Sequence, residues 1–410
     1  MKTVFIIVIS LFIKINICFA YSALTHLAIV DAAWQDILLP ALKHRFPNAT
    51  EEQLKQAKAF AYGGSVTPDL GYGRHGSDLF SDLIHYVRTG DFVRTILLEA
   101  QDINEYAFAL GVLTHYYGDS YGHSIGVNRS VPLMFPEMKI KFGDVVTFAD
   151  DNLTHLRTEF SFDVVQAERG NYVSKAYHDF IGFQISKPVL QRAFLKTYGL
   201  DIDDLFKNFE KAVGSFRWIV KDLMPQITKR AWKSNKNEIK KISPSTTRHL
   251  FVYRMKRLDY FGEFGKVREK KSIVAEIFAF IFRISPKVGS LKRWKFKTPT
   301  HDAQLLFTKS FDSAVINYKI GVKRSESPDP GFTNLDWDTG KRTAQHEYSL
   351  ADQTYSNWLL KLKEKNFETI NPALKENILA FYNGYIPDGT VAAGQWQLTS
   401  IALEELKNKN

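Results

Sequence analysis

Cysteine is almost absent from this sequence: Cys18 is the one cysteine among 410 residues. A chain with one thiol can form no internal disulfide, so it does not belong to the small disulfide-stabilised scaffolds. Strand-like alternation of polar and apolar residues is also scarce, and no internal repeat or low-complexity segment interrupts the chain. These absences exclude a repeat protein and predict an all-α fold.

The first twenty residues have the composition of a secretory signal peptide. Lys2 precedes an apolar run that ends at the small residue Ala20, and Lys14 makes this run too short and too interrupted to span a membrane. We therefore expect cleavage near Ala20, a mature chain that begins at Tyr21, and export to the periplasm or the extracellular medium. The exported chain would lack cysteine and would depend on core size or on metal for its stability.

Residues 105–128, EYAFALGVLTHYYGDSYGHSIGVN, combine a helical apolar pattern with three metal-binding side chains. His115, Asp119 and His123 are four residues apart, which places them one turn apart on nearly the same helix face. Gly111, Gly118 and Gly122 each cost about 1 kcal/mol of helix propensity relative to alanine, so another backbone or a metal shell is expected to pack close. Two histidines and a carboxylate on one face indicate zinc ligands, although an ordinary polar face with hydrogen-bonded histidines would have the same spacing.

Two further candidate ligands lie in residues 61–90. The glycine, proline and polar residues of this range predict an irregular loop, and long loops in compact domains are usually functional. Asp69 follows a proline within it, and His85 opens a helical-looking segment near its end.

The remaining candidates lie near the N-terminus and beyond the central stretch. His26 stands at the start of a predicted amphipathic helix, where a surface or capping role is the ordinary interpretation. A polar connection is expected up to Asp150, followed by a helix on which His155 and Glu159 are four residues apart and face the same side. Such a pair can bind one ion, but alone it is more typical of a solvated helix face.

Together these residues resemble the zinc-dependent phospholipase C family. The family signature is a free N-terminus closely followed by histidine, then a PD loop, HY, an HYxGD helix and a final HxxxE. This sequence contains, in that order, Tyr21 with His26, PD at 68–69, HY at 85–86, HYYGD at 115–119 and HLRTE at 155–159. The resemblance covers roughly residues 21–165 and extends to the metal domain of glycosylphosphatidylinositol-specific phospholipase D and, more distantly, to single-strand-specific zinc nucleases.

The resemblance implies three zinc ions held without thiolates. One ion would be bound by Asp69, His85, His115 and Asp119. The second would be bound by His123, His155 and Glu159. The third would be bound by the α-amino group and carbonyl of Tyr21, by His26, and by Asp119 as a bridging carboxylate. Asp69 is also implied as the residue that orients or deprotonates the attacking water.

Two departures from the family pattern concern the third zinc and the substrate. The family commonly begins with Trp, whereas Tyr21 stands here, but ligation through backbone atoms does not depend on the side chain. Asp119 and His123 are four residues apart, which is shorter than in the secreted bacterial phospholipases C and resembles the glycosylphosphatidylinositol-specific enzyme. The identity of the lipid head group therefore stays undetermined.

We expect a catalytic domain over residues 21–235 and a basic, mostly helical extension over 236–410, which could also form one globule with it. The excess charge is local: residues 221–297 contain 21 Lys/Arg against 6 Asp/Glu, which favours anionic partners and a transient membrane-surface contact. The apolar segment 272–284 is too short to span a bilayer and is interpreted as a buried helix, with an interfacial membrane contact as the alternative.

Three functions fit these observations. The first is an exported phospholipase C acting on a phospholipid substrate through a zinc-activated water. The second is a single-strand nuclease or nucleotidase with the same zinc site, in which case nucleic acid would be the partner. The third is a non-catalytic membrane- or polyanion-binding protein with structural metals, against which the thiolate-free ligand set argues.

Overall fold

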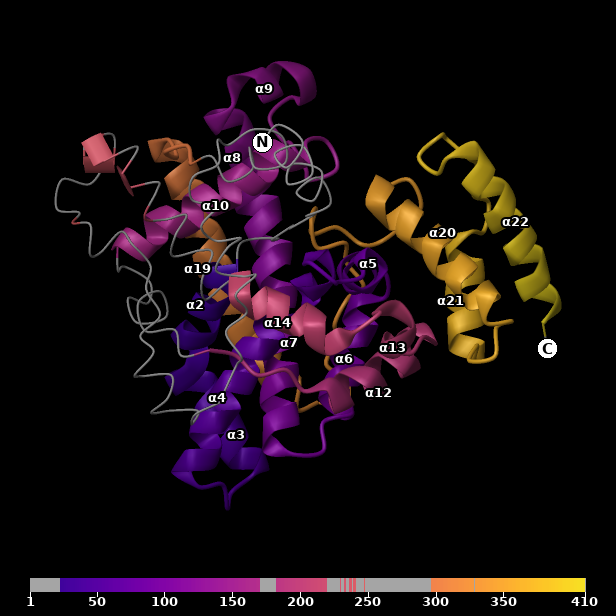
Figure 1. The fold of residues 1–410 in the computed structure, drawn as a ribbon, viewed down its shortest axis with the longest axis horizontal. Coiled ribbons are helices and arrows are strands. Elements are labelled where there is room, and N and C mark those ends of the chain that lie inside the picture. The colour runs from indigo at the N-terminus through magenta and orange to yellow at the C-terminus, as the bar shows by residue number, and fades with distance from the viewer. Residues whose placement is uncertain are drawn as a thin grey trace, which may run out of the picture.

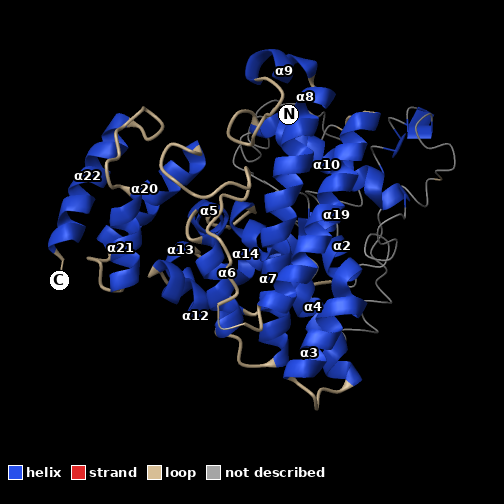
Figure 2. Ribbon diagram, turned by 180° about the vertical axis from the view of Figure 1, so that it is seen from behind, coloured by secondary structure: helices blue, strands red, loops and turns tan. Residues whose placement is uncertain are grey.

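The computed structural model describes residues 23–169, 182–219, 296–327 and 329–409, and isolated residues between 229 and 247. In these ranges the regular structure is helical, apart from an isolated antiparallel bridge between Leu335 and Arg342 (Figure 2). The all-α prediction is confirmed. The expected signal peptide, Tyr21, the apolar segment 272–284 and most of the basic segment 221–297 lie outside the described residues.

The helices run in chain order as α2 (Ala23–Ala33), the π-helix η1 (Trp34–Leu38), α3 (Leu39–Arg45), α4 (Glu51–Val66), the 3₁₀ helix η2 (Thr67–Tyr72), α5 (Asp78–Tyr86), α6 (Thr89–Leu98), α7 (Ile103–Tyr121), the π-helix η3 (Gly122–Val127), α8 (Asn128–Met134), α9 (Pro136–Phe142), α10 (Asn152–Arg169), α12 (Lys187–Tyr198), α13 (Ile202–Leu205), α14 (Phe209–Trp218), α19 (His301–Arg324), α20 (Ser349–Glu364), α21 (Pro372–Phe381) and α22 (Ala393–Asn408).

Helix α7 lies at the centre of the molecule. Helices α4 and α19 pack along it, and α2 contacts all three (Figures 1 and 2). The N-terminus of α7 is capped by Asp102, whose carboxylate accepts hydrogen bonds from the backbone N–H groups of Asn104 and Glu105 at 2.8 and 2.9 Å. Such a cap satisfies two of the amide groups that a helix start leaves without partners. Nearly every residue of α7 is buried, so the helix is a core element.

Glycines allow α4 and α7 to cross with their backbones in contact. A Cβ atom at Gly111 would lie 2.1 Å from the carbonyl oxygen of Ala61, and one at Gly64 would lie 1.9 Å from that of Phe108. Neither distance is compatible with a side chain. The low helix propensity of these glycines is therefore offset by packing, as the sequence predicted for Gly111.

Among the C-terminal helices, α20 packs against α5, and α22 lies on the outer side of α20 and α21 (Figure 1). The buried indole N–H of Trp358 on α20 donates to the carbonyl of Tyr198 at the end of α12, at 2.7 Å. The buried apolar residues before and after residue 235 belong to one connected cluster. The domain boundary at 235 stays a prediction.

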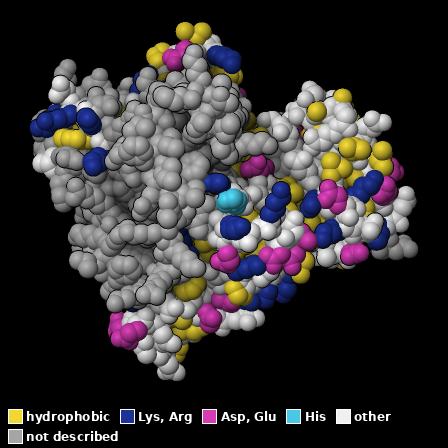
Figure 3. Space-filling view, in the orientation of Figure 1, with side chains coloured by type: hydrophobic (Ala, Val, Ile, Leu, Met, Phe, Trp, Pro, Cys, Tyr) yellow, Lys and Arg dark blue, Asp and Glu magenta, His cyan; other side chains and the backbone are white. Residues whose placement is uncertain are grey.

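On the right of the face in Figure 3, over the C-terminal helices, basic and acidic side chains are interspersed. Among the described helices, none has the length and the apolar character that crossing a membrane requires.

Two of the local predictions are wrong. Residues 61–90 are mostly helical: α4 continues to Val66, η2 follows, and His85 lies in the last turn of α5 rather than at the start of a helix. The expected connection up to Asp150 contains helices α8 and α9. In the first case the glycines that predicted a loop serve helix packing instead, because a tertiary contact overrides local propensity.

Gly111→Ala should destabilise the fold, because the added methyl group meets a carbonyl oxygen that cannot move without shifting α4. We expect a loss of about 3 kcal/mol in the free energy of unfolding, measured by urea denaturation. Gly214 in α14 is the matched control, since nothing lies within 4 Å of its added Cβ. Gly214→Ala should stabilise by about 0.5–1 kcal/mol. Equal effects of the two substitutions would contradict the close crossing.

Candidate metal centre

The candidate ligands come from six elements of the helical fold. His115 and Asp119 lie on α7, and His123 follows in the π-helix η3. The others are His26 on α2, Asp69 on η2, His85 on α5, and His155 and Glu159 on α10. All eight side chains are at most 2% exposed. Tyr21, the ninth predicted ligand, lies outside the described residues.

Asp119 is the hub of the site. Its carboxylate oxygens lie 3.2 Å from Nε2 of His26, 3.3 Å from Nε2 of His85, 2.9 Å from Nε2 of His115 and 3.5 Å from Nε2 of His123. The π-helical turn at η3 changes the helix phase after Asp119, and π-turns of this kind are frequent at functional sites. One carboxylate thus contacts histidines from four elements.

A second carboxylate organises the far end of the site. Oε1 of Glu159 lies 2.9 Å from Nδ1 of His155 and 3.6 Å from Nδ1 of His123. His123 therefore stands between Asp119 and Glu159 and connects the two ends. At the opposite end, Oδ1 of Asp69 lies 3.6 Å from Nε2 of His85 and 3.9 Å from Nε2 of His115.

These atoms form three adjoining groups, each with ligand atoms within 4.8 Å of one another. The groups are His26, Asp69 and His115; His85, His115 and Asp119; and His123, His155 and Glu159. The last group coincides with the set that the family resemblance implies for one zinc. The first two divide the remaining ligands differently from the resemblance, because Asp69 lies with His26 as well as with His115.

The geometry fits cations better than hydrogen-bonded pairs. Among the described residues, no donor forms a well-aligned hydrogen bond to a carboxylate oxygen of Asp69 or Asp119, although both are fully buried. Tetrahedral ligands about 2.0–2.2 Å from zinc are separated from one another by roughly 3.3–3.6 Å. Two of the four nitrogen–oxygen distances around Asp119, those to His85 and His123, lie in this range. Three groups of nitrogen and carboxylate donors without thiolate are suitable zinc sites that leave positions for water.

In three of the histidines, one ring nitrogen is engaged by a neighbouring carbonyl oxygen. The other ring nitrogen is therefore the one available to bind metal. Nδ1 of His85 lies 2.8 Å from the carbonyl oxygen of Ser81, and Nδ1 of His115 lies 2.8 Å from that of Ser65. Since a carbonyl only accepts, Nδ1 carries the proton in both rings and Nε2 faces the carboxylates. His155 is reversed: its Nε2 lies 2.9 Å from Oδ1 of Asn128, which leaves Nδ1 toward Glu159.

The pKa values follow from burial and from the crowded carboxylates. Burial, with the charge of His123 added, lowers the pKa of His155 well below its usual value, so the ring is neutral, as metal ligation requires. Burial opposes ionisation of Asp119, but His115 and His123 hold the pKa of this carboxyl well below its usual range. Although burial opposes it, the close carboxylates of Asp119 and Asp69 raise the pKa of His85 well above its usual value. A cation bound at Nε2 of His85 would replace the proton that the raised pKa places there, so metal affinity should depend on pH.

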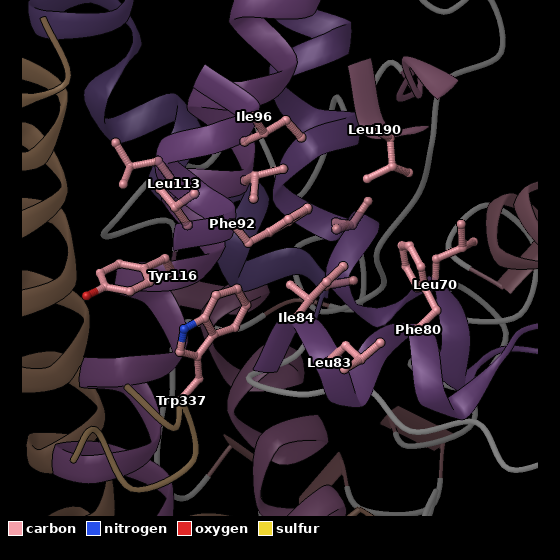
Figure 4. Packing of buried hydrophobic residues seen from close by; sticks show 14 of the residues in the cluster. Leu70, Phe80, Leu83, Ile84, Phe92, Ile96, Leu113, Tyr116, Leu190 and Trp337 are labelled. Atoms are coloured by element: carbon pink, nitrogen blue, oxygen red, sulfur yellow. The ribbon is translucent and has the colours of Figure 1, made fainter. Parts of the chain in front are cut away.

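A segment from the C-terminal half covers part of the site. The indole ring of Trp337 lies 5.0 Å from the ring of His85 and 5.4 Å from the ring of His115, and its backbone N–H donates to the carbonyl of His85 at 3.0 Å. Figure 4 shows Trp337 beside Tyr116 within the buried cluster. Residues 335–340, LDWDTG, have the composition of a turn. Apart from a tryptophan in this polar turn, the sequence contains no sign that they reach the ligands.

Residues 25–208 match the family described as zinc dependent phospholipase C. This part of the chain belongs to the zinc-dependent phospholipase C family. The matched range contains all eight described candidate ligands but neither Tyr21 nor residues 335–340. Comparison with curated proteins and with solved structures finds no match. The family assignment that the sequence predicted is confirmed, while the role of each ligand stays a prediction.

Asp82, one turn before His85, should make stability depend on pH. Burial is the largest cause that raises its pKa to about 7, against an opposing hydrogen bond from the hydroxyl of Tyr72. Because the folded-state pKa exceeds the unfolded value, the contribution of Asp82 to stability falls as pH rises from about 4 to about 7. Asp82→Asn removes the ionisation and keeps an oxygen for Tyr72.

The metal-free Asp82→Asn variant should therefore be more stable than the wild type at pH 8 by about 1–2 kcal/mol, since a partly exposed carboxyl is screened. The gain should be about half as large at pH 5.5. Urea denaturation at both pH values measures it, and a gain that does not change with pH would contradict the raised pKa of Asp82.

Proposed function

We propose that this protein is an exported zinc-dependent phospholipase C that hydrolyses the head-group phosphodiester of phospholipids. The proposal rests mainly on one observation: three adjoining buried ligand groups within the segment that belongs to the family. Each group offers three protein ligands, and an open coordination position is typical of catalytic rather than structural zinc. Three ions are therefore expected.

When bound, zinc supplies positive charge that activates water and neutralises the oxygens of the phosphodiester. In this proposal Asp69 orients the attacking water and takes its proton. The turn that carries Asp69 is held from both sides by Ser81, whose hydroxyl donates to the carbonyl of Pro68 and accepts from the N–H of Gly71 at 2.9 Å. The same Ser81 supplies the carbonyl that orients His85. A fixed base is what positioned proton transfer needs.

The test measures metal content and substrate range together. Purified mature protein should contain close to three zinc ions and should release head groups from vesicles of several phospholipids. Asp119→Ala should lose more than one ion and reduce hydrolysis at least about a hundredfold, because this carboxylate contacts four histidines. Zinc without lipid hydrolysis but with cleavage of single-stranded DNA would favour a nuclease. Zinc without either activity would favour structural metals, and no zinc after repletion would contradict the proposal.

A second prediction concerns the N-terminus. The start of α2 is anchored, since the backbone N–H of Leu24 and the hydroxyl of Thr25 donate to Asp163 at 3.3 and 2.8 Å, next to the buried His26. Tyr21 is two residues from Ala23, and two residues span at most about 7 Å. If its α-amino group, with a pKa of about 7.7–8.0, binds the third zinc, it must be free.

Protein with a short extension before Tyr21 should thus lose one zinc and most of its activity while it stays folded by circular dichroism. The same extension placed after Asn410 is the control and should change neither quantity. Equal zinc content and hydrolysis in the N-terminally extended and mature forms would show that the amine is no ligand.

A further inference from the structure

Residues 335–340 are seated against the ligand-bearing helices although they lie far outside the family match. The segment forms a turn in which the backbone N–H of Gly340 donates to the carbonyl of Asp336 at 2.9 Å. Gly340 has a φ of +72°, and a Cβ there would lie 2.7 Å from the carbonyl oxygen of Ser120 and 3.2 Å from the hydroxyl of Ser124. The turn therefore rests on the end of α7, beside the residues that follow Asp119 and His123.

Asn128 connects this turn to His155. Its side-chain amide Nδ2 donates to the backbone carbonyl of Asp338 at 2.7 Å, while its Oδ1 faces Nε2 of His155 at 2.9 Å. A carbonyl can only accept, so the Asp338 carbonyl determines which end of the amide faces it. The opposite orientation would place two carbonyl oxygens together and would present N–H to Nε2 of His155. That arrangement would move the ring proton to Nδ1, the atom that faces Glu159.

Hydrogen bonds to the side chain of Asp338 hold its backbone carbonyl in place. One carboxylate oxygen, Oδ2, accepts from the hydroxyls of Tyr86 at 2.9 Å and Tyr348 at 2.6 Å. Tyr86 directly follows the candidate ligand His85 on α5, and Tyr348 directly precedes α20. The carboxylate thus links the turn to a ligand-bearing helix and to the C-terminal helices, and all three side chains are buried.

We propose that Asn128 and Asp338 are positioning residues of the metal centre, which together select the tautomer of His155 that leaves Nδ1 free for metal. Residues 335–340, which follow the family-matched range, would thus form part of the metal centre. The inference rests on the metal centre of the proposed function. Partners of this kind on ligating histidines typically change metal affinity 10- to 100-fold when they are removed.

The experiment measures zinc affinity by competition with a chromophoric chelator, at a temperature where every variant is folded by circular dichroism. Asn128→Leu removes the acceptor for His155, and Asp338→Ala releases the turn. Each should weaken the binding of one zinc by about 10- to 100-fold and leave the other ions in place. Asp338→Asn should stay within about threefold of the wild type, because a single oxygen accepts both tyrosine hydroxyls.

Asp352→Ala is the matched control. Asp352 is also a buried carboxylate of the C-terminal half, but its oxygens accept from the backbone N–H of His346, both at 3.2 Å. This variant should lower the melting temperature without a change in zinc affinity.

If Asn128→Leu and Asp338→Ala behave like the Asp352→Ala control, with lower melting temperature and wild-type affinity for every zinc, the inference is wrong and the metal centre stands. Equal losses in Asp338→Ala and Asp338→Asn would also contradict it. A wild-type protein that binds no zinc would overturn the metal centre and the inference together.

Discussion

The buried carboxylate of Asp119 is the constraint on which the metal centre depends. It is removed from water and lies within 2.9–3.5 Å of nitrogens from four histidines, which come from α2, α5, α7 and η3. Removing a carboxylate and several imidazoles from water costs several kcal/mol for each charged group unless hydrogen bonds or cations compensate. The helices that meet here bring together donors that could bind a common cation.

The close contact of α4 with α7 serves this site as well as the core. Helix α4 supplies none of the described ligands. It supplies the carbonyl of Ser65, which orients His115, and that carbonyl can reach the ring because Gly64 and Gly111 let the two backbones touch. A similar function belongs to Gly118, where a Cβ would lie 2.7 Å from Nδ1 of His26. Glycine positions that weaken the helices locally therefore determine how the ligands are placed.

The glycines of α4 also explain why residues 61–90 were predicted incorrectly. A run with Gly63 and Gly64 before Pro68 has the local composition of a loop. In the folded chain, a Cβ at Gly63 would lie 1.6 Å from the backbone oxygen of Gln184, more than a hundred residues away in sequence. No local pattern contains that information, because the contact exists only after distant segments have packed.

The sequence by itself determined the helical class, the family and the side chains that can bind metal. These properties follow from local spacing: His115 and Asp119 share a face because a helix turns every 3.6 residues, and His155 and Glu159 do so for the same reason. The tertiary structure decided which nitrogen of each ring is available and which distant residues complete the site. Those choices depend on backbone carbonyls, such as the carbonyl of Asp338, that every residue type carries and that only the folded chain brings next to an imidazole.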